Sequence, residues 1–496
     1  MKRAFFLIVT IVSVVGFIQQ RDPVIFLIGD STVANKPLIG NPERGWGQFL
    51  PAFFREGITI ENHARNGRST KSFLSEGRWD AVMHRLQPGD FVLIQFGHND
   101  SKTEDTTRFA APRTTYRTNL LRFINETRSK QGNPILITPV CRRRFDKDGK
   151  FYDVHGEYPD VVRELGREQN VPVIDLTKRS KELFERLGVD ESAARFMRAD
   201  SGFFSALPKG KKDDTHFMSL GASEIAGLVA EEIRSLGLPL TQHLVPTAEV
   251  KFEGVGRNVV LDNFYNNERR TDSTGKAVRY HYVWHDSTNS GFSTLGDIIA
   301  KTGATIDTLC QQPTAENLKR ASIYIVVDPD TPKETEKPNV IDANAAAAIS
   351  QWVNAGGVLV LFANDKGNSE FAGLNLLAEK FGIHFNEDSR NRVAGREYQT
   401  GTFDKFPPHP LFDDVRKIFI KELSTLRLQE PALPLFVDGA DVIIASARVG
   451  KGFVFAVGDP WFYNEYMGTW RLPEGYDNRK AAENLFRWIM KSSVSH

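Results

Sequence analysis

Short apolar runs alternate with amphipathic stretches along the first half of the chain. The apolar runs that predict strands are residues 24–28, 58–62, 91–95, 135–140 and 171–175. Between them, the spacing of apolar residues predicts helices that include residues 116–130, 158–169 and roughly 221–237. Strands that alternate with helices in this way are typical of a parallel sheet with helices on both faces.

The second half of the chain shows the same alternation without a detectable internal repeat. Strands are predicted at residues 259–261, 323–327, 358–362, 442–446 and 453–457, and helices at 295–302, 343–354 and 479–491. Residues 238–252 contain two prolines and no clear periodicity. A chain of 496 residues is also too long for one ordinary core. We therefore expect two α/β domains, at residues 21–240 and 253–496, joined by a linker at 241–252.

The N-terminus has the pattern of a secretory signal peptide. Met1-Lys2-Arg3 gives a basic start and residues 4–18 an apolar run, so we predict a signal peptide over residues 1–20. The run is short for a membrane span, which needs roughly 20 apolar residues. We expect a secreted or periplasmic protein, with no membrane contact beyond a leader that stays uncleaved.

The composition narrows the possible partners. Hydrophobic residues make up 41% of the chain and charged residues 25%, as in soluble globular proteins. The formal net charge of +1 gives no general attraction to polyanions, so no nucleic-acid partner is expected. Cys141 and Cys310 fall in different predicted domains, which excludes a disulfide framework.

Four short polar segments of the first half carry the candidate chemistry. They are Gly29-Asp30-Ser31-Thr32, Asn66-Gly67-Arg68-Ser69, Gly97-His98-Asn99-Asp100 and Asp213-Asp214-Thr215-His216. The first three follow predicted strands and the fourth precedes the last helix of the domain. Because active sites of α/β folds lie at the carboxyl ends of the strands, we expect these segments to meet.

Serine hydrolysis explains why these residue types occur together. Ser31 would attack an acyl carbonyl, with His216 as general base and then general acid. Asp213 lies three residues before His216, so a turn can bring its carboxylate back to orient the ring. The neighbouring Asp214 is the alternative orienting residue.

The oxyanion of such a reaction needs hydrogen-bond donors about 3 Å away. The candidates are the backbone N–H groups of Ser31 and Gly67 and the side-chain amide of Asn99. Asp30 is interpreted as a structural hydrogen-bonding residue beneath the turn.

In this order, the four segments resemble the SGNH (GDSL-type) hydrolases, and within them the rhamnogalacturonan acetylesterases. Thr138-Pro139-Val140 and the arginines after it also look like that family, and the resemblance covers about residues 22–240. It implies a three-layer α/β/α fold, no metal or other cofactor, and removal of acetyl groups from galacturonic acid residues of pectic rhamnogalacturonan. The implied triad is Ser31, Asp213 and His216, and the implied oxyanion hole is Ser31, Gly67 and Asn99. The expected partner is an acetylated pectic polysaccharide or oligosaccharide.

Several residues near these segments are candidates for substrate binding. They are Trp46, His98, Arg142, Arg143, Arg144 and His155. An arginine could meet a galacturonate carboxylate and a tryptophan could stack on a sugar ring. Each also has a structural explanation: core packing for the tryptophan, packing at the sheet edge or a solvated loop for the histidines, and surface ion pairs for the arginines.

The second half is expected to be non-catalytic. Residues 343–362 resemble class-I glutamine-amidotransferase-like domains, which implies a flavodoxin-like α/β fold. In that family a nucleophilic cysteine would follow such a strand, whereas this chain has Ala363-Asn364-Asp365. The domain could brace the esterase or bind polysaccharide through aromatic rings. The aromatic candidates are Tyr280, Tyr282, Trp284, Trp461, Tyr463, Tyr466 and Trp470.

Other functions stay open at this point. The first is an SGNH esterase for other acylated glycans, such as acetylxylan, or for lipid or thioester substrates. A lipid substrate would need a long apolar pocket, whereas the loops around the four segments are rich in Arg, Asn and Lys. The second is an inactive glycan-binding protein, against which the complete triad argues.

Overall fold

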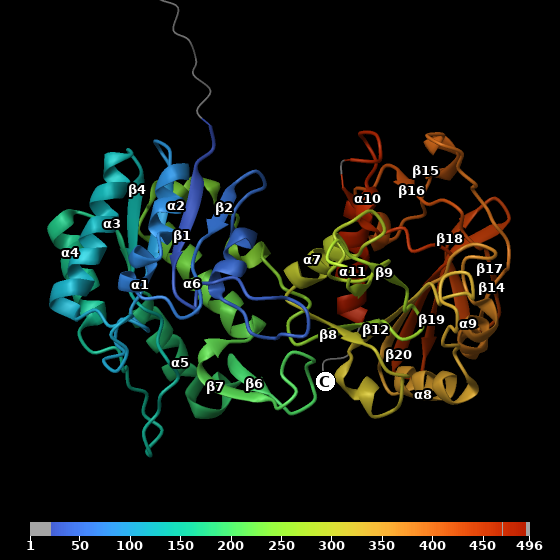
Figure 1. The fold of residues 1–496 in the computed structure, drawn as a ribbon, viewed down its shortest axis with the longest axis horizontal. Coiled ribbons are helices and arrows are strands. Elements are labelled where there is room, and N and C mark those ends of the chain that lie inside the picture. Colours follow the sequence, from blue (N-terminus) through green and yellow to red (C-terminus); the bar gives the residue numbers. More distant parts are fainter. Residues whose placement is uncertain (1–20, 469, 493–496) are drawn as a thin grey trace, which may run out of the picture.

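The computed structural model describes residues 21–468 and 470–492, which form two domains side by side (Figure 1). The predicted signal peptide, residues 1–20, lies outside the described residues. Within the described ranges, every helix is too short or too polar to cross a membrane.

The first domain is built on a parallel sheet of five strands. The strands are β1 (Val24–Gly29), β2 (Thr59–Asn62), β3 (Phe91–Gln95), β4 (Asn133–Ile137) and β5 (Val173–Ile174). Their order across the sheet is β2-β1-β3-β4-β5, and every neighbouring pair is parallel. The central strands are continuous apolar runs because both faces of the sheet are covered.

Helices cover the two faces of this sheet. One face packs against α1 (Thr70–Ser75), α2 (Arg78–Arg85), α3 (Arg117–Ser129) and α4 (Tyr158–Gln169). The other packs against α5 (Leu176–Ala193), α6 (Ser219–Ser235) and the short helices η1 (Trp46–Gln48) and η2 (Leu50–Phe53). The predicted α/β domain with a parallel sheet is confirmed. An antiparallel pair that the sequence analysis missed, β6 (Phe196–Ala199) and β7 (Lys211–Phe217), precedes α6.

The second domain has a larger, mixed sheet. Its parallel part consists of β8 (Asn258–Asp262), β11 (Thr305–Leu309), β12 (Ile323–Val327), β13 (Val358–Phe362) and β20 (Gly452–Val457), in the order β11-β8-β12-β13-β20. Antiparallel strands then extend it: β19 (Asp441–Val449), β17 (Leu426–Leu428), β14 (Ile383–Phe385) and β18 (Ala432–Asp438). The expected flavodoxin-like sheet would lack this extension. The β18–β19 pair is irregular, and such bulges increase twist and curl a sheet.

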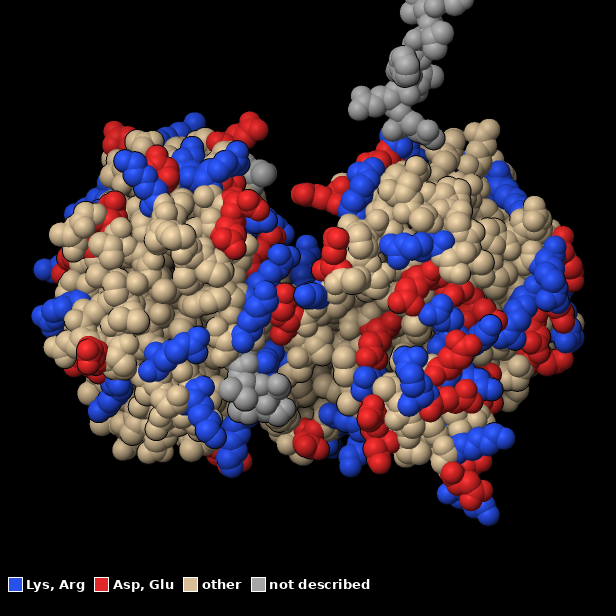
Figure 2. Space-filling view, turned by 180° about the vertical axis from the view of Figure 1, so that it is seen from behind, with Lys and Arg blue, Asp and Glu red and all other residues tan. Residues whose placement is uncertain are grey.

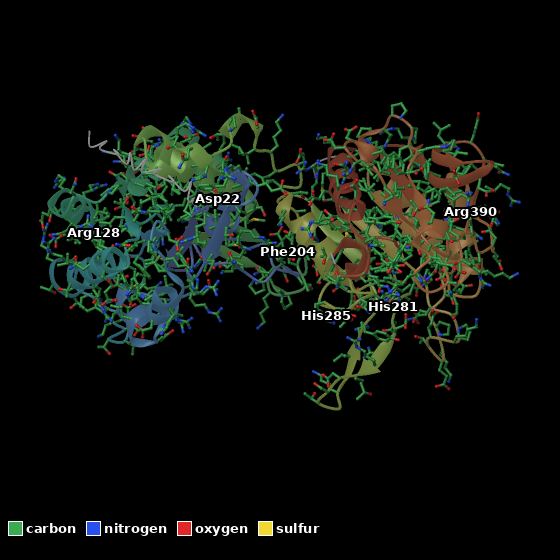
Figure 3. The ribbon with its side chains drawn as sticks, turned by 90° about the horizontal axis from the view of Figure 1, so that it is seen from above. Asp22, Arg128, Phe204, His281, His285 and Arg390 are labelled. Carbon is green, nitrogen blue, oxygen red and sulfur yellow. The ribbon has the colours of Figure 1, made fainter. Side chains whose placement is uncertain are left out.

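The remaining elements of the second domain cover this sheet or project from it. On one face lie α7 (Ser293–Lys301), α10 (Asn464–Met467) and α11 (Asn478–Ser492), and on the other α8 (Ala343–Asn354) and α9 (Phe371–Ala378). The pair β15 (Thr402–Phe403) and β16 (Ile418–Phe419) forms a small separate sheet. The hairpin of β9 (Arg269–Thr271) and β10 (Ala277–Arg279) projects from the domain (Figure 3).

Most of the aromatic residues proposed to stack on sugars lie in the core instead. Five of them are at most 5% exposed: Tyr282, Trp284, Trp461, Tyr463 and Tyr466. Trp470, by contrast, is 58% exposed. The burial removes these five ring faces from solvent, so they stabilise the domain rather than offer a surface to a sugar.

The two domains meet at the edge strand β11. The backbone N–H of Gly40 donates to the carbonyl of Ile306 over 2.7 Å, which adds a short parallel bridge to the second sheet. Next to it, the fully buried Asp307 accepts hydrogen bonds from the backbone N–H and hydroxyl of Ser205 and from Arg320 Nη1 at 3.0 Å. Ser205 and Gly40 belong to two different loops of the first domain. Strand β11 of the second domain is therefore hydrogen-bonded to both loops.

Replacing Asp307 tests this contact. Asp307→Ala removes the acceptor of Ser205 and the carboxylate partner of Arg320, which keeps only its bond to the Thr308 carbonyl, so we expect the free energy of unfolding to fall by about 3 kcal/mol, measured by urea denaturation. Lys319→Ala is the matched control, because the Lys319–Glu316 ion pair is exposed and should contribute less than about 1 kcal/mol. Equal effects of the two substitutions would contradict a structural role for Asp307.

Candidate active site

The turn that carries Ser31 follows directly from the burial of β1. The strand ends at Gly29, where a Cβ atom would lie 2.6 Å from the Gln95 carbonyl oxygen of the neighbouring strand. Asp30 follows, and its Oδ1 accepts hydrogen bonds from the backbone N–H and the hydroxyl of Thr32 at 2.9 and 2.8 Å. The carboxylate thereby fixes the turn, and the Ser31 hydroxyl lies at the carboxyl edge of the sheet.

Ser31, His216 and Asp213 form a continuous chain of hydrogen bonds. Ser31 Oγ lies 2.8 Å from His216 Nε2, and His216 Nδ1 lies 2.6 Å from Asp213 Oδ2. The other oxygen of Asp213 accepts from the backbone N–H groups of Thr215 and His216 at 2.7 and 3.2 Å. Partial burial opposes ionisation of Asp213, but the hydrogen bonds and the charge of His216 hold its pKa well below the ordinary value. The pair can therefore take the proton of Ser31 and stabilise the resulting imidazolium.

Candidate oxyanion donors lie on two adjoining loops. Gly67 adopts a φ of +75°, which glycine tolerates and other residues rarely adopt. The Asn99 side-chain amide donates one hydrogen bond to the Arg68 carbonyl at 3.1 Å. An amide carries two donor hydrogens, so a second is available for a developing oxyanion.

A chain of charged side chains connects Asp213 to the loop of Gly67. Lys211 Nζ lies 3.4 Å from Asp213 Oδ2 and 2.7 Å from Glu43 Oε2. The other oxygen of Glu43 lies 2.8 Å from Lys36 Nζ, which donates to Asn66 Oδ1 at 2.5 Å. Lys36, Glu43 and Lys211 cannot be recognised from the sequence, because no local motif links residues so far apart in the chain.

Asp214, the alternative orienting residue, faces the arginines instead of His216. Its carboxylate pairs with Arg143 at 3.1 Å, with Arg144 at 3.6 Å and with Arg198. Two of the three arginines predicted to contact substrate are thus held in ion pairs within the domain.

The two candidate histidines are buried beside the site. His98 Nδ1 lies 3.1 Å from Asp30 Oδ2, and His155 Nδ1 lies 2.6 Å from Asp153 Oδ1. The rings of His98 and His155 are 4.7 Å apart, edge to face. Both residues are only 2% exposed, so in this structure they support the loops rather than face a substrate.

Trp46 does not lie where the sugar-stacking hypothesis needs it. It is fully buried, and its Nε1 donates to Gln95 Oε1 at 2.9 Å within the core. Trp46 is therefore a core residue, and its prediction as a substrate contact is wrong. Among residues 21–468 and 470–492, no group of three or more His, Cys, Asp and Glu side chains is arranged to hold a metal ion.

Comparisons with known proteins agree with the first domain. Residues 27–217 match the GDSL-like Lipase/Acylhydrolase family. The chain is 44% identical over 228 residues to rhamnogalacturonan acetylesterase RhgT of Bacillus subtilis. The aligned region covers 46% of this chain and 97% of that protein. It is 38% identical over 221 residues to probable rhamnogalacturonan acetylesterase YesY of the same organism, covering 45% and 97%. A solved structure, protein YxiM of Bacillus subtilis, is 25% identical with a TM-score of 0.39, covering 44% of this chain and 58% of that one.

The buried Asp30–His98 pair predicts acid sensitivity. Burial lowers the pKa of His98 from 6.5 to about 4 despite the neighbouring Asp30 carboxylate. Between pH 6.5 and 4 the unfolded chain therefore binds a proton that the folded chain does not, and stability falls as the pH falls. We expect His98→Gln to weaken this loss, measured as the urea midpoint at several pH values. An unchanged pH dependence would contradict a neutral, buried His98.

Proposed function

Because this chain belongs to the GDSL-like lipase/acylhydrolase family, we propose that it removes acetyl groups from pectic rhamnogalacturonan. The family and the two acetylesterase relatives make it a carboxylic-ester hydrolase. The observation that carries the proposal is the hydrogen-bond chain from Ser31 through His216 to Asp213, at 2.8 and 2.6 Å. The proposed polysaccharide substrate is taken from the names of the two relatives, because the match extends over 97% of the length of each.

The reaction proceeds through an acetyl-enzyme. Ser31 Oγ attacks the acetyl carbonyl while His216 takes its proton, and the N–H groups of Ser31 and Gly67 and the amide of Asn99 stabilise the oxyanion. The intermediate collapses, and His216 gives the proton to the departing sugar hydroxyl. Water, deprotonated by His216, then attacks the acetyl-Ser31 ester, and acetate leaves as Ser31 regains its proton.

Arg142 is the arginine best placed to meet a galacturonate carboxylate. Its Nη2 donates to the His98 carbonyl at 3.1 Å and its Nη1 to the hydroxyl of Thr215 at 3.3 Å, in strand β7, which carries His216. A guanidinium has five donor hydrogens, so several are left for a substrate carboxylate.

The second domain is proposed to be accessory and non-catalytic. Ala363-Asn364-Asp365 stands where an amidotransferase-like domain would carry its cysteine. The polar pair there is already engaged, since Asn364 donates to Asp328 at 3.0 Å and Asp365 accepts from Ser389 at 2.6 Å. We also propose that residues 1–20 direct export, which places the enzyme where it can reach a polysaccharide.

Acetate release tests the reaction and its substrate. The unmodified chain should release acetate from acetylated rhamnogalacturonan, and Ser31→Ala should reduce the rate by at least about a thousandfold because the nucleophile is lost. Acetylated xylan and an aryl acetate serve as comparison substrates. Activity on xylan alone would overturn the pectic assignment, and inactivity on all three would favour a glycan-binding protein.

The two neighbouring aspartates provide a matched test of the triad. Asp213→Asn should lower kcat on the aryl acetate by about 10³–10⁴, since an amide can hold His216 in the wrong tautomer. Asp214→Asn should change kcat by less than about tenfold, because Asp214 contacts arginines. The reverse order of effects would assign the orienting role to Asp214.

A further inference from the structure

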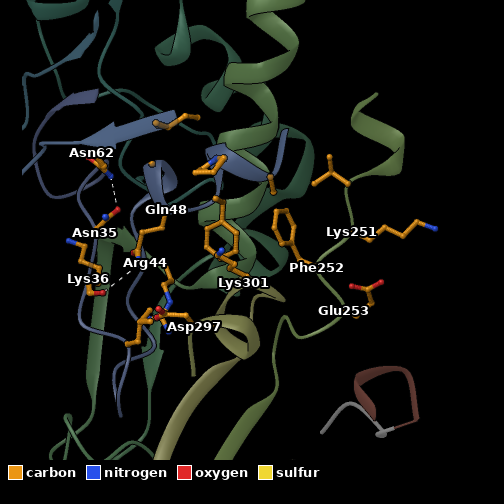
Figure 4. A pocket seen from close by; sticks show the side chains of 18 of the residues that line it. Asn35, Lys36, Arg44, Gln48, Asn62, Lys251, Phe252, Glu253, Asp297 and Lys301 are labelled. Atoms are coloured by element: carbon orange, nitrogen blue, oxygen red, sulfur yellow. Dashed lines mark hydrogen bonds between the residues drawn. The ribbon is translucent and has the colours of Figure 1, made fainter. Parts of the chain in front are cut away.

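A cleft of about 860 Å³ lies between the two domains, along the β2 edge of the first domain. One wall is formed by residues 35–52 and the edge of β2, and the other by the linker, α7 and α11. Figure 4 shows Lys36, Arg44 and Gln48 on one side and Lys251, Phe252 and Glu253 on the other. The volume is within the range of about 300–1,000 Å³ that is typical of ligand sites, which often occur at domain interfaces.

Basic side chains outnumber acidic ones along the cleft, although one of them, Lys36, is paired with Glu43 behind the wall. Five Lys and Arg side chains line it, against three Asp and Glu side chains. Lys301 of α7 and Arg487 of α11 are exposed, and among the described residues neither has a hydrogen bond or an ion pair within 4 Å, although the charge of Lys301 attracts Asp297 one turn away on α7. One of the three acids, Glu253, lies 3.8 Å from Lys491. Figure 2 shows the hollow between the domains, with both basic and acidic side chains along it.

The wall formed by the first domain holds a buried guanidinium. Arg44 is 2% exposed and donates to the carbonyls of Asn41 and Glu43, but its Nη2 has no hydrogen-bond partner among the described residues. Burial lowers the pKa of Arg44 to about 10 despite the attraction of Glu43, so the side chain is charged at neutral pH. Its charge adds to the attraction that the exposed cations Lys301 and Arg487 exert on an anion in the cleft.

Apolar surface lies between these charges. The partly exposed Phe252 packs edge to face on the buried Phe49, 4.9 Å between ring centroids, and Leu38, Pro51 and Ile60 continue the lining. Sugar rings pack their C–H faces on such surfaces while their polar groups turn outward. Apolar patches flanked by the exposed cations Lys301 and Arg487 therefore fit a ligand that combines sugar rings with carboxylates.

The cleft is linked to the candidate active site through one of its lining residues. Lys36 lines the cleft, and its Nζ donates to Asn66 at 2.5 Å, one residue before Gly67. We propose that the cleft binds a uronic-acid segment of the polysaccharide whose acetyl groups the esterase site removes. This inference rests on the proposed function, and it gives the second domain a direct part in holding the substrate.

Binding of galacturonic acid oligosaccharides to the full chain tests the cleft. In a Ser31→Ala background, Lys301→Met and Arg487→Met should each weaken binding about two- to fivefold and together about tenfold, measured by titration calorimetry. With Ser31 present, the double variant should raise KM for the acetylated polymer and leave kcat and the hydrolysis of an aryl acetate unchanged. Neutral xylo-oligosaccharides should bind weakly to every variant.

Lys380→Met and Lys451→Met are the matched controls. Both lysines are exposed in the second domain and neither lines the cleft, so their loss should leave affinity unchanged. Equal affinity of the cleft variants and the parent, or no uronate binding at all, would overturn the proposal. The proposed function is tested separately from the cleft. It would be wrong if the unmodified chain released acetate from acetylated xylan but not from the pectic polymer.

Discussion

The catalytic edge of the first sheet depends on two buried carboxylates that bind loops from different strands. Asp30 holds Thr32 of the nucleophile turn and His98 at the end of β3. Asp100 accepts from the backbone N–H and hydroxyl of Thr70, close to the Gly67 loop, and burial raises its pKa to about 7. A buried polar group is costly without partners, so each carboxylate fixes the loops that supply its donors. The relative positions of nucleophile and oxyanion donors follow from this constraint.

The second domain contacts two segments of the first domain that lead to the same site. Strand β11 holds the segment around Gly40 and the loop of Ser205, which precedes β7 and therefore the turn of Asp213 and His216. The side chains of Lys36, Glu43 and Lys211 connect these two segments within the first domain. A shift of β11 would thus act on both the segment around Gly40 and the segment that leads to Asp213 and His216.

The sequence allowed the first domain and its chemistry to be predicted because the relevant signals are local. Ser31 ends an apolar run, and Asp213 stands one turn before His216, so short segments carry the information. Lys211 and Glu43 are 168 residues apart, and their contact exists only after folding. For Trp46 the sequence leaves sugar stacking and core packing both open, and only the fold shows that its ring is fully buried. The antiparallel extension of the second sheet was missed because its short, irregular strands lack a clean alternation.

The bridge between Gly40 and Ile306 also has a consequence for how the chain can be divided. Strand β11 is the outermost strand of the parallel part of the second sheet, and the first domain covers part of its edge. Unpaired strand edges readily pair with other chains. A C-terminal fragment cut at the linker would expose the backbone of β11 and the carboxylate of Asp307 together. The catalytic domain therefore also acts as a cap against self-association, and the two halves are not interchangeable modules joined by a tether.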